Sequence, residues 1–170
     1  MHSLIGDISQ LNLQGTINPE EISVDTLLVD CKLLLFELLR EKEVEITLLK
    51  TGTIFVDRTA ATQLLMNLLK NSVEHSKRDR CVILIDLEVS ENAKILSVKD
   101  NGKGIPEEVL PKIFQAGIRG RRQPGGMGLG LFICRRIVSL HGGTITIRNR
   151  KPTGVEAEIR LPPPTSNRFR

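Results

Sequence analysis

Three alternating glycines stand where a helix has to begin. They are Gly126, Gly128 and Gly130 of the stretch "GGMGLGL", and the apolar periodicity that follows predicts a helix over 129–140. Glycine costs about 1 kcal/mol relative to alanine inside a helix, so its repeated use here indicates that the backbone approaches another group closely. The unpaired N–H groups at a helix start, together with the helix dipole, favour an anion. A phosphate is therefore the ligand that we expect at this point.

Two long amphipathic segments and several short apolar runs form the rest of the pattern. Helices are predicted over 25–40, with Asp25 as the N-cap, and over 57–76. The first of them is expected to bury its leucines, namely Leu27, Leu28, Leu34, Leu35, Leu38 and Leu39. Strands are predicted at 44–49, 54–56, 82–89, 94–99, 144–148 and 155–161. The connection over 100–128 has little periodicity, which is typical of a lid or a binding loop.

Composition favours one ordinary globular domain. The 170 residues are 40% hydrophobic and 26% charged, and no apolar run approaches the about 20 residues that a membrane span needs. No export signal is recognisable at the amino terminus. The cysteines Cys31, Cys81 and Cys134 form no CxxC pair, so we expect buried thiols in a reducing compartment.

The positive charge is unevenly distributed. The segment 109–155 contains no Asp or Glu and carries many of the chain's Lys and Arg residues. Such a segment attracts polyanions, which makes nucleic acid a partner to consider. The chain has no Trp or Tyr and only five Phe, however, so aromatic platforms for single-stranded bases are scarce. We therefore expect no nucleic-acid partner.

A polar stripe runs along the second predicted helix. Asn67, Asn71 and Glu74 are spaced i, i+4 and i+7, and the other faces of this helix carry leucines. One interpretation is a stripe exposed to solvent. The other is a row of amide oxygens facing a cleft, where they could coordinate a hard cation such as Mg²⁺ beside substrate phosphates.

A second polar motif, "VKDNGKGIPEE", follows a predicted strand. It places the carboxylate of Asp100 at the strand end, followed by Gly102 and Gly104. Asp-Asn-Gly alone is a common turn signal. Its position at the start of the connection that "GGMGLGL" closes favours a binding loop, in which Arg119, Arg121 and Arg122 could neutralise the bound anion. The glycine spacing fits neither a P-loop nor a Rossmann fingerprint.

These motifs together resemble those of a known family. "NLLKNSVEHS", "DNGKGI", the pair "IF" before the arginine-bearing segment, and "GGMGLGL" are similar, in this order, to the N, G1, F and G2 boxes of the sensor histidine kinase catalytic domain. This domain belongs to the GHKL superfamily. The resemblance covers about residues 17–162 and implies a two-layer α/β sandwich with a mixed, mostly antiparallel sheet and helices on one face.

The resemblance also implies roles for individual residues. Asn71 would be the Mg²⁺ ligand, Asn67 would face the phosphates, and Asp100 would accept a hydrogen bond from the adenine amino group. The glycines of both motifs would let the backbone approach the ATP. The full set of expected site residues is Asn67, Asn71, Glu74, His75, Asp100, Gly102, Gly104, Ile105, Arg119, Arg121, Arg122, Gly126, Met127, Gly128, Leu129, Gly130 and Leu131.

The activity implied is that of a protein-histidine kinase. The domain would bind Mg-ATP and donate the γ-phosphate to a histidine on the dimerisation domain, for relay to a response regulator. ATP-hydrolysing relatives place a glutamate four residues before the metal-binding asparagine, where this chain has Asn67, so hydrolysis is disfavoured. We expect none of His2, His75 and His141 to be the phosphoacceptor.

Two alternatives stay open from the sequence. One is an anti-sigma-type serine kinase or ATPase of the same superfamily. The other is a degenerate nucleotide pocket that docks a partner protein. It is suggested by two departures from the family pattern, namely Gly117 where a second aromatic often follows Phe114, and Val155 where many relatives have threonine after Gly154.

The expected organisation follows from the same resemblance. Residues 1–15 would be the remnant of a dimerisation helix, 16–162 the ATP-binding catalytic domain, and 163–170 a disordered tail. The domain is expected in the cytoplasm. The parent protein would be a homodimer that could be anchored in a membrane, and this fragment would be monomeric.

Overall fold

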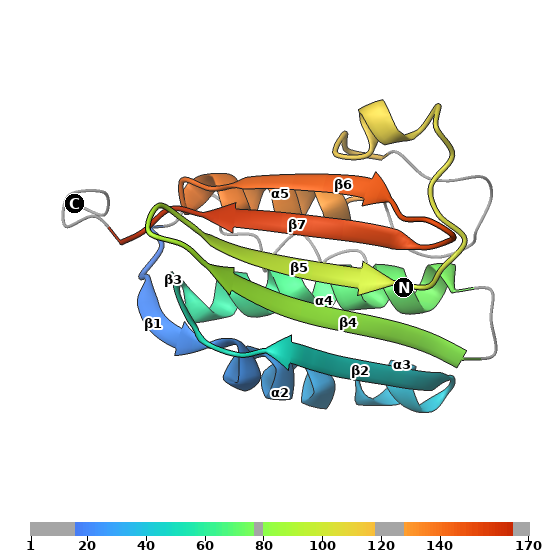
Figure 1. Cartoon of the computed structure of the whole chain (residues 1–170), viewed down its shortest axis with the longest axis horizontal. Helices are drawn as coiled ribbons and strands as arrows, with labels where there is room; N and C mark the ends of the chain where they lie inside the picture. Colours follow the sequence, from blue (N-terminus) through green and yellow to red (C-terminus); the bar gives the residue numbers. More distant parts are fainter. Residues whose placement is uncertain (1–15, 77–79, 118–127, 165–170) are drawn as a thin grey trace, which may run out of the picture.

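The fold has two layers. The computed structural model describes residues 16–76, 80–117 and 128–164. One layer is a five-stranded sheet and the other consists of helices that cover one of its faces (Figure 1). The strand order is β2-β4-β5-β7-β6, with β2 at Glu43–Lys50, β4 at Arg80–Val89, β5 at Lys94–Asp100, β7 at Val155–Leu161 and β6 at Thr144–Asn149. The predicted α/β sandwich is confirmed.

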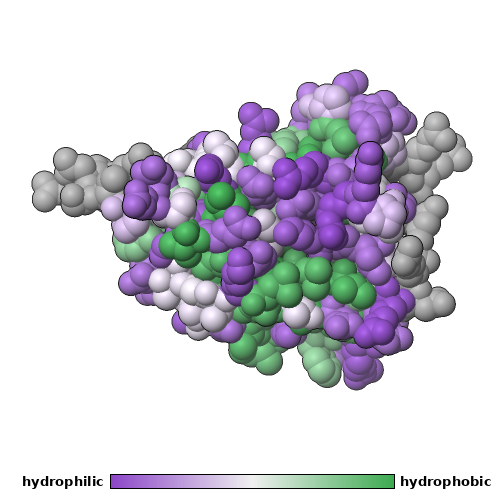
Figure 2. All heavy atoms as spheres, viewed as in Figure 1, coloured by the Kyte–Doolittle hydropathy of each residue, from purple (hydrophilic) through white to green (hydrophobic). Residues whose placement is uncertain are grey.

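The sheet is mixed, as expected. Strands β2 and β4 run parallel, and every other neighbouring pair is antiparallel. The side chains of β4 alternate, with Ile83, Ile85 and Leu87 buried against the helices. The opposite face is more polar, and ion pairs such as Lys99–Glu156 cross it. Figure 2 shows this face, where hydrophilic residues adjoin hydrophobic patches.

In the helical layer, helix α4 (Arg58–His75) lies between helix α5 (Gly130–Leu140) and helix α2 (Val24–Leu34) (Figure 1). Asp57 caps α4, because its carboxylate accepts from the backbone N–H of Ala60 at 3.0 Å. The predicted helix over 57–76 is therefore confirmed, and Asp57, its predicted first residue, is the N-cap. The leucine, isoleucine and valine side chains of both helices pack against the sheet, and Leu65, Leu69 and Val138 are almost completely buried.

The predicted helix over 25–40 is wrong in its continuity and in its cap. It is two helices, α2 (Val24–Leu34) and α3 (Phe36–Arg40), and Ser23 caps the first by accepting from the Thr26 N–H at 3.1 Å. Leu35 leaves the helical conformation between them. The buried side of α2 consists of Val24, Leu27, Leu28 and Cys31 and continues to Leu35. Leu34, the last residue of α2, is 64% exposed although we expected it to be buried.

A second, two-stranded sheet lies at the edge of the fold. Strand β1 (Glu20–Ser23) pairs antiparallel with β3 (Thr53–Val56). Only β3 was predicted, because "EEIS" contains a single apolar residue, Ile22, which is buried. The pairing joins the start of α2 to the segment that leads into α4, and it supports both helices from one end.

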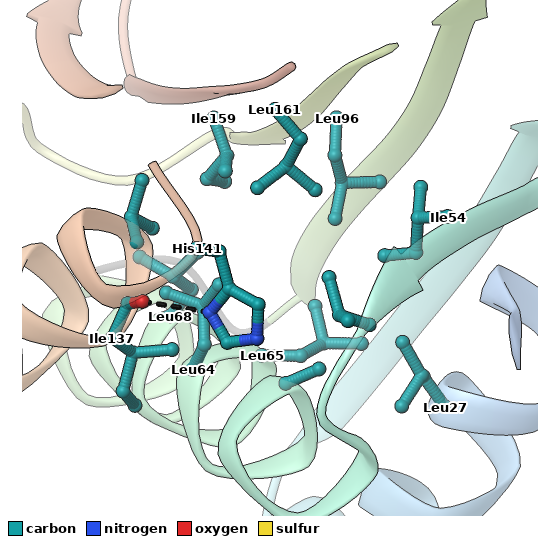
Figure 3. Close-up of a pocket in the computed structure, with 13 residues that line it drawn as sticks. Leu27, Ile54, Leu64, Leu65, Leu68, Leu96, Ile137, His141, Ile159 and Leu161 are labelled. Atoms are coloured by element: carbon teal, nitrogen blue, oxygen red, sulfur yellow. Dashed lines mark hydrogen bonds between the residues drawn. The ribbon is translucent and has the colours of Figure 1, made fainter. Parts of the chain in front are cut away.

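A small cavity of about 20 Å³ lies inside the core. Figure 3 shows its walls, which come from α2, β3, α4, the sheet and the end of α5, and among the described residues His141 is the only polar one that lines it. The volume is about that needed for one water molecule. The cavity is part of the packed interior and contains none of the predicted site residues.

The three cysteines are buried free thiols, as predicted. Across the described ranges, no helix combines the length and apolar character needed to cross a membrane. The predicted helix remnant over 1–15 and residues 165–170 of the predicted tail lie outside the described residues.

Candidate nucleotide-binding site

Asp100 is the centre of the hydrogen-bond network at the end of β5. Its side chain is buried, with 8% of the residue exposed. Oδ1 accepts from the backbone N–H groups of Gly102 and Val155, both at 2.9 Å, and Oδ2 accepts from the hydroxyl of Ser72 at 3.1 Å. The donors come from three different parts of the fold, namely the loop after β5, the start of β7 and helix α4. Asp100 is therefore held in a single orientation.

The turn between β6 and β7 packs directly against this loop. Gly154 has φ of 107°, and a Cβ atom there would lie 1.9 Å from the carbonyl oxygen of Asp100. The same carbonyl accepts from Nη1 of Arg150 at 3.0 Å, and Thr153 donates its hydroxyl to the carbonyl of Gly102. Only glycine fits position 154, because both its backbone conformation and its close approach exclude a side chain.

Gly102 and Gly104 lie where the predicted loop leaves the sheet. Gly104 has φ of 81°, which favours glycine. The next residue, Ile105, is held by Asn149, whose amide accepts from the Ile105 N–H at 2.7 Å and donates to the Ile105 carbonyl at 2.8 Å. The side chain of Asn149 thus fixes the path of the loop after Asp100.

The polar stripe of α4 faces the start of α5 at one point. Nδ2 of Asn67 donates to the carbonyl of Gly130 at 3.3 Å, and Oδ1 of Asn67 accepts from Gln63 at 3.2 Å. This contact brings Gly130, the last glycine of "GGMGLGL" and the first residue of α5, beside the stripe. The two motifs are more than sixty positions apart in the sequence, so their proximity comes from the antiparallel packing of α4 and α5.

The remaining residues of the stripe differ in their surroundings. Asn71 is half-buried and its amide makes no hydrogen bond to another described residue. Glu74 and His75 are exposed, and Glu74 makes a long ion pair with Lys70 at 3.8 Å. The pKa of His75 is below its ordinary value, because of desolvation at the helix end and then because of the nearby charge of Lys103. The stripe passes from a half-buried to an exposed environment.

Helix α5 begins without a side-chain cap and without an acidic residue in its first turn. Just before it, Gly128 has φ of 67°, and its carbonyl accepts from the N–H of Gly117 at 3.2 Å. Leu129 and Leu131 pack against the core. The N–H groups of this helix start are therefore available for an anion. Five predicted site residues lie outside the described residues, namely Arg119, Arg121, Arg122, Gly126 and Met127.

Sequence reasoning missed the residues that hold Asp100 in place. Ser72, Asn149 and Gly154 were not among the predicted site residues, although each contacts the loop that begins at Asp100. A serine on the buried side of a leucine-rich helix was the one available signal for Ser72. The described site brings together a buried carboxylate, two helix asparagines and an uncapped helix start.

Comparison with known proteins agrees with this arrangement. Residues 56–165 match the model of the family described as histidine kinase-, DNA gyrase B- and HSP90-like ATPase. The chain is 38% identical over 96 residues to the sensor histidine kinase GtrS of Pseudomonas aeruginosa. The aligned region covers 56% of this chain and 20% of GtrS. The chain is also 40% identical over 115 residues to the sensor protein KdpD of Escherichia coli, and the aligned region covers 66% of this chain and 13% of KdpD. The chain therefore spans a fifth or less of these two curated relatives.

Solved structures with the same fold include other catalytic domains of this type. The catalytic domain of the histidine kinase ThkA has a TM-score of 0.71 and 30% identity, and the match covers 86% of this chain and 98% of that domain. Full-length ShkA in complex with AMPPNP has a TM-score of 0.76 and 25% identity, over 94% of this chain and 35% of ShkA. ThkA has also been solved in complex with the response regulator protein TrrA, with a TM-score of 0.67 and 30% identity over 85% of this chain and 41% of that chain.

The family model covers well over half of the chain, and GtrS and ThkA are histidine kinases. The chain belongs to the histidine kinase-, DNA gyrase B- and HSP90-like ATPase family, and it is a catalytic and ATP-binding domain of the sensor histidine kinase type.

Proposed function

We propose that this domain binds Mg-ATP and donates the γ-phosphate to a histidine on the dimerisation domain of its kinase, for relay to a response regulator. The observation that carries the proposal is the buried carboxylate of Asp100, which three donors from separate elements hold at the end of β5. A carboxylate that is buried and held in one orientation is suited to accept a hydrogen bond from a donor group of a ligand.

The adenine end of the nucleotide would lie at Asp100. An ionised carboxylate only accepts hydrogen bonds and offers about four lone-pair positions. Three of these are occupied by Ser72, Gly102 and Val155, so one position on Oδ2 can accept from the adenine amino group. Gly102 and Gly104 allow the backbone to pass close to the base. Ile105 and His75 would lie at the rim of the site.

The phosphate end would lie between α4 and the start of α5. Asn71 fits a Mg²⁺ ligand, since its half-buried amide has no partner among the described residues and oxygen ligands suit this ion. The ion would neutralise phosphate charge when it is bound. Asn67 and the uncapped N–H groups after Gly128 would orient the phosphates, with Gly130, Leu129 and Leu131 forming the wall of this end.

Phosphoryl transfer needs positioning and charge neutralisation more than covalent chemistry from the protein. The described residues can supply the positioning through Asp100 at one end and Asn67 and Asn71 at the other. Hydrolysis needs a general base that activates the attacking water molecule, and position 67 carries an amide where a hydrolase would use a glutamate. Transfer to a partner histidine is favoured over hydrolysis for this reason.

The proposed partners follow from the family and from the complexes of its relatives. ThkA has been solved with the response regulator TrrA, and full-length ShkA with AMPPNP, a nucleotide analogue. By analogy we propose a dimerisation domain and a response regulator as the partners of this domain. Glu74, Arg119, Arg121, Arg122, Gly126 and Met127 stay proposed nucleotide contacts.

Calorimetric titration tests the proposal. The chain is titrated with ADP and with a non-hydrolysable ATP analogue, each with and without Mg²⁺. We expect binding that Mg²⁺ strengthens, a loss of at least about tenfold in Asp100→Asn, and loss of the Mg²⁺ effect in Asn71→Ala. Asp30→Asn is the matched control, since Asp30 contacts Arg58 in a surface ion pair, and it should bind like the wild type.

Three results would contradict the proposal. The first is the absence of nucleotide binding by the intact chain, which would favour a protein-docking role. The second is sustained Mg²⁺-dependent ATP hydrolysis by the isolated chain, which would favour an ATPase. A labelled partner that carries phosphoserine in place of phosphohistidine would favour the serine kinase alternative.

A further inference from the structure

Ser72 is the one side chain among the described residues that donates to the carboxylate of Asp100. The other two donors are backbone N–H groups, from Gly102 and Val155, and both bind Oδ1. Ser72 alone contacts Oδ2, at 3.1 Å. The oxygen that would face the nucleobase is therefore the one that Ser72 holds.

Burial makes this hydrogen bond effective. Ser72 is 6% exposed and Asp100 is 8% exposed, so water has little access to either group. A hydrogen bond to a charged group in such surroundings has a larger effect than one at the surface. Without the hydroxyl, Oδ2 would lose its only donor within the described part of the chain.

Helix α4 also fixes the position of the Ser72 oxygen. Its hydroxyl lies 3.1 Å from the carbonyl of Leu68, one turn earlier, as well as 3.1 Å from Oδ2 of Asp100. A hydroxyl has one proton, so the two acceptors compete for it while the oxygen stays between them. A ligand amino group can donate to the remaining lone-pair position of Oδ2 while the Ser72 hydroxyl still donates to the other.

From this geometry we infer that Ser72 is a positioning residue for nucleobase recognition, and that it sets the preference for a base with an exocyclic amino group. The inference rests on the proposed nucleotide-binding function. Adenine offers a donor to Oδ2, whereas hypoxanthine presents a carbonyl oxygen at the same place, which the carboxylate repels. When the carboxylate is held in one orientation, the difference in affinity between the two bases is large. When the carboxylate is free to rotate, this difference is small.

The test compares ADP with inosine diphosphate, which differs from ADP in its base. Dissociation constants of both are measured by calorimetry for the wild type, Ser72→Ala, Ser72→Thr and Ser76→Ala. Ser76 is the matched control, because it is a buried serine one turn further along and makes no hydrogen bond to Asp100. Thermal unfolding of each variant checks that it is folded.

We expect Ser72→Ala to weaken ADP binding by about fivefold and to leave inosine diphosphate binding within about twofold, so the preference for ADP falls. Ser72→Thr keeps a hydroxyl and should keep the preference, as should Ser76→Ala. An unchanged preference in Ser72→Ala, or an equal loss for both nucleotides, would overturn the positioning role while the proposed function stands. A wild type that binds neither nucleotide would overturn both.

Discussion

The backbone N–H of Asp57 donates to Nε2 of His141 at 2.9 Å. This bond joins the cap of α4 to the residue that ends α5, across 84 positions of sequence. Since Nε2 accepts, Nδ1 carries the ring proton and donates it to the carbonyl of Ile137 at 2.8 Å. His141 is 4% exposed and lines the core cavity (Figure 3), so the imidazole is a structural link between the two helices that carry the proposed site.

Replacement of His141 should destabilise the domain. His141→Ala leaves the partly buried N–H of Asp57 without its acceptor and enlarges the existing cavity. We expect the free energy of unfolding to fall by about 2–4 kcal/mol. Urea unfolding measures this change, with the exposed Ser139→Ala on the same helix as the control. A change of less than about 0.5 kcal/mol in His141→Ala would show that the link is dispensable.

Asp57 should contribute to the pH dependence of stability. Burial alone would raise its pKa, but the N–H groups of Ala60 and Asn18 and the nearby His141 outweigh this effect and hold the pKa below its ordinary value. A carboxyl with a lowered pKa stabilises the fold above its unfolded pKa of about 3.9, and this contribution is lost as the pH falls through the folded pKa.

The variant Asp57→Asn keeps a good N-cap but does not titrate. We expect its free energy of unfolding to fall less steeply than that of the wild type between about pH 5 and about pH 3. Glu156 also has a lowered pKa, since Arg148 outweighs the effect of burial, but it is common to both proteins and cancels in the comparison. Parallel curves for the two proteins would contradict a role of Asp57 in this range.

Gly154 should tolerate no side chain. A Cβ atom in Gly154→Ala would lie 1.9 Å from the Asp100 carbonyl oxygen, so the turn and the carboxylate would have to move apart. We expect a loss of at least about 3 kcal/mol in stability and a loss of nucleotide binding. The control is Gly117→Ala, which also has positive φ but meets no atom within 4 Å, and it should cost only about 1 kcal/mol. Equal effects in both variants would assign the loss to backbone conformation alone.

The elements that the sequence predicted well depend on local patterns. Helix α4 was predicted together with Asp57 as its start, because its leucines recur at helical spacing and a capping residue precedes them. The strands of the large sheet were recognised from their Val, Ile and Leu content. Four ordered motifs were enough to indicate the family, which the comparisons confirm.

The errors and omissions concern contacts between distant residues. Leu34 and Leu35 were both expected to be buried in a single helix, whereas α2 ends at Leu34, which is exposed, and Leu35 is buried. Strand β1 exists because β3 pairs with it, and its own sequence gives little sign of a strand. The contacts of Asp100 with Ser72 and Val155 span 28 and 55 positions, so no local pattern could reveal them. The assignments of single residues to the nucleotide and the metal stay predictions.

The three cysteines should be inert in the folded domain. Burial, and then the charge of Asp30, raises the pKa of Cys31 to about 12, and burial raises that of Cys134 to about 12. The pKa of Cys81 is raised by the same cause. At pH 8 a thiol with a pKa of 12 is ionised in only about one molecule in ten thousand, and the thiolate is the reactive form.

Reaction with Ellman's reagent at pH 8 measures this directly. We expect almost no reaction in the native domain and reaction of all three thiols in a denaturant, because unfolding restores both their accessibility and their ordinary pKa. Denaturant concentrations at which the thiols become reactive should match those at which the helical signal is lost. Rapid reaction of a full equivalent in the native state would show that one of these thiols is accessible through local opening, and variants of each cysteine to serine would identify it.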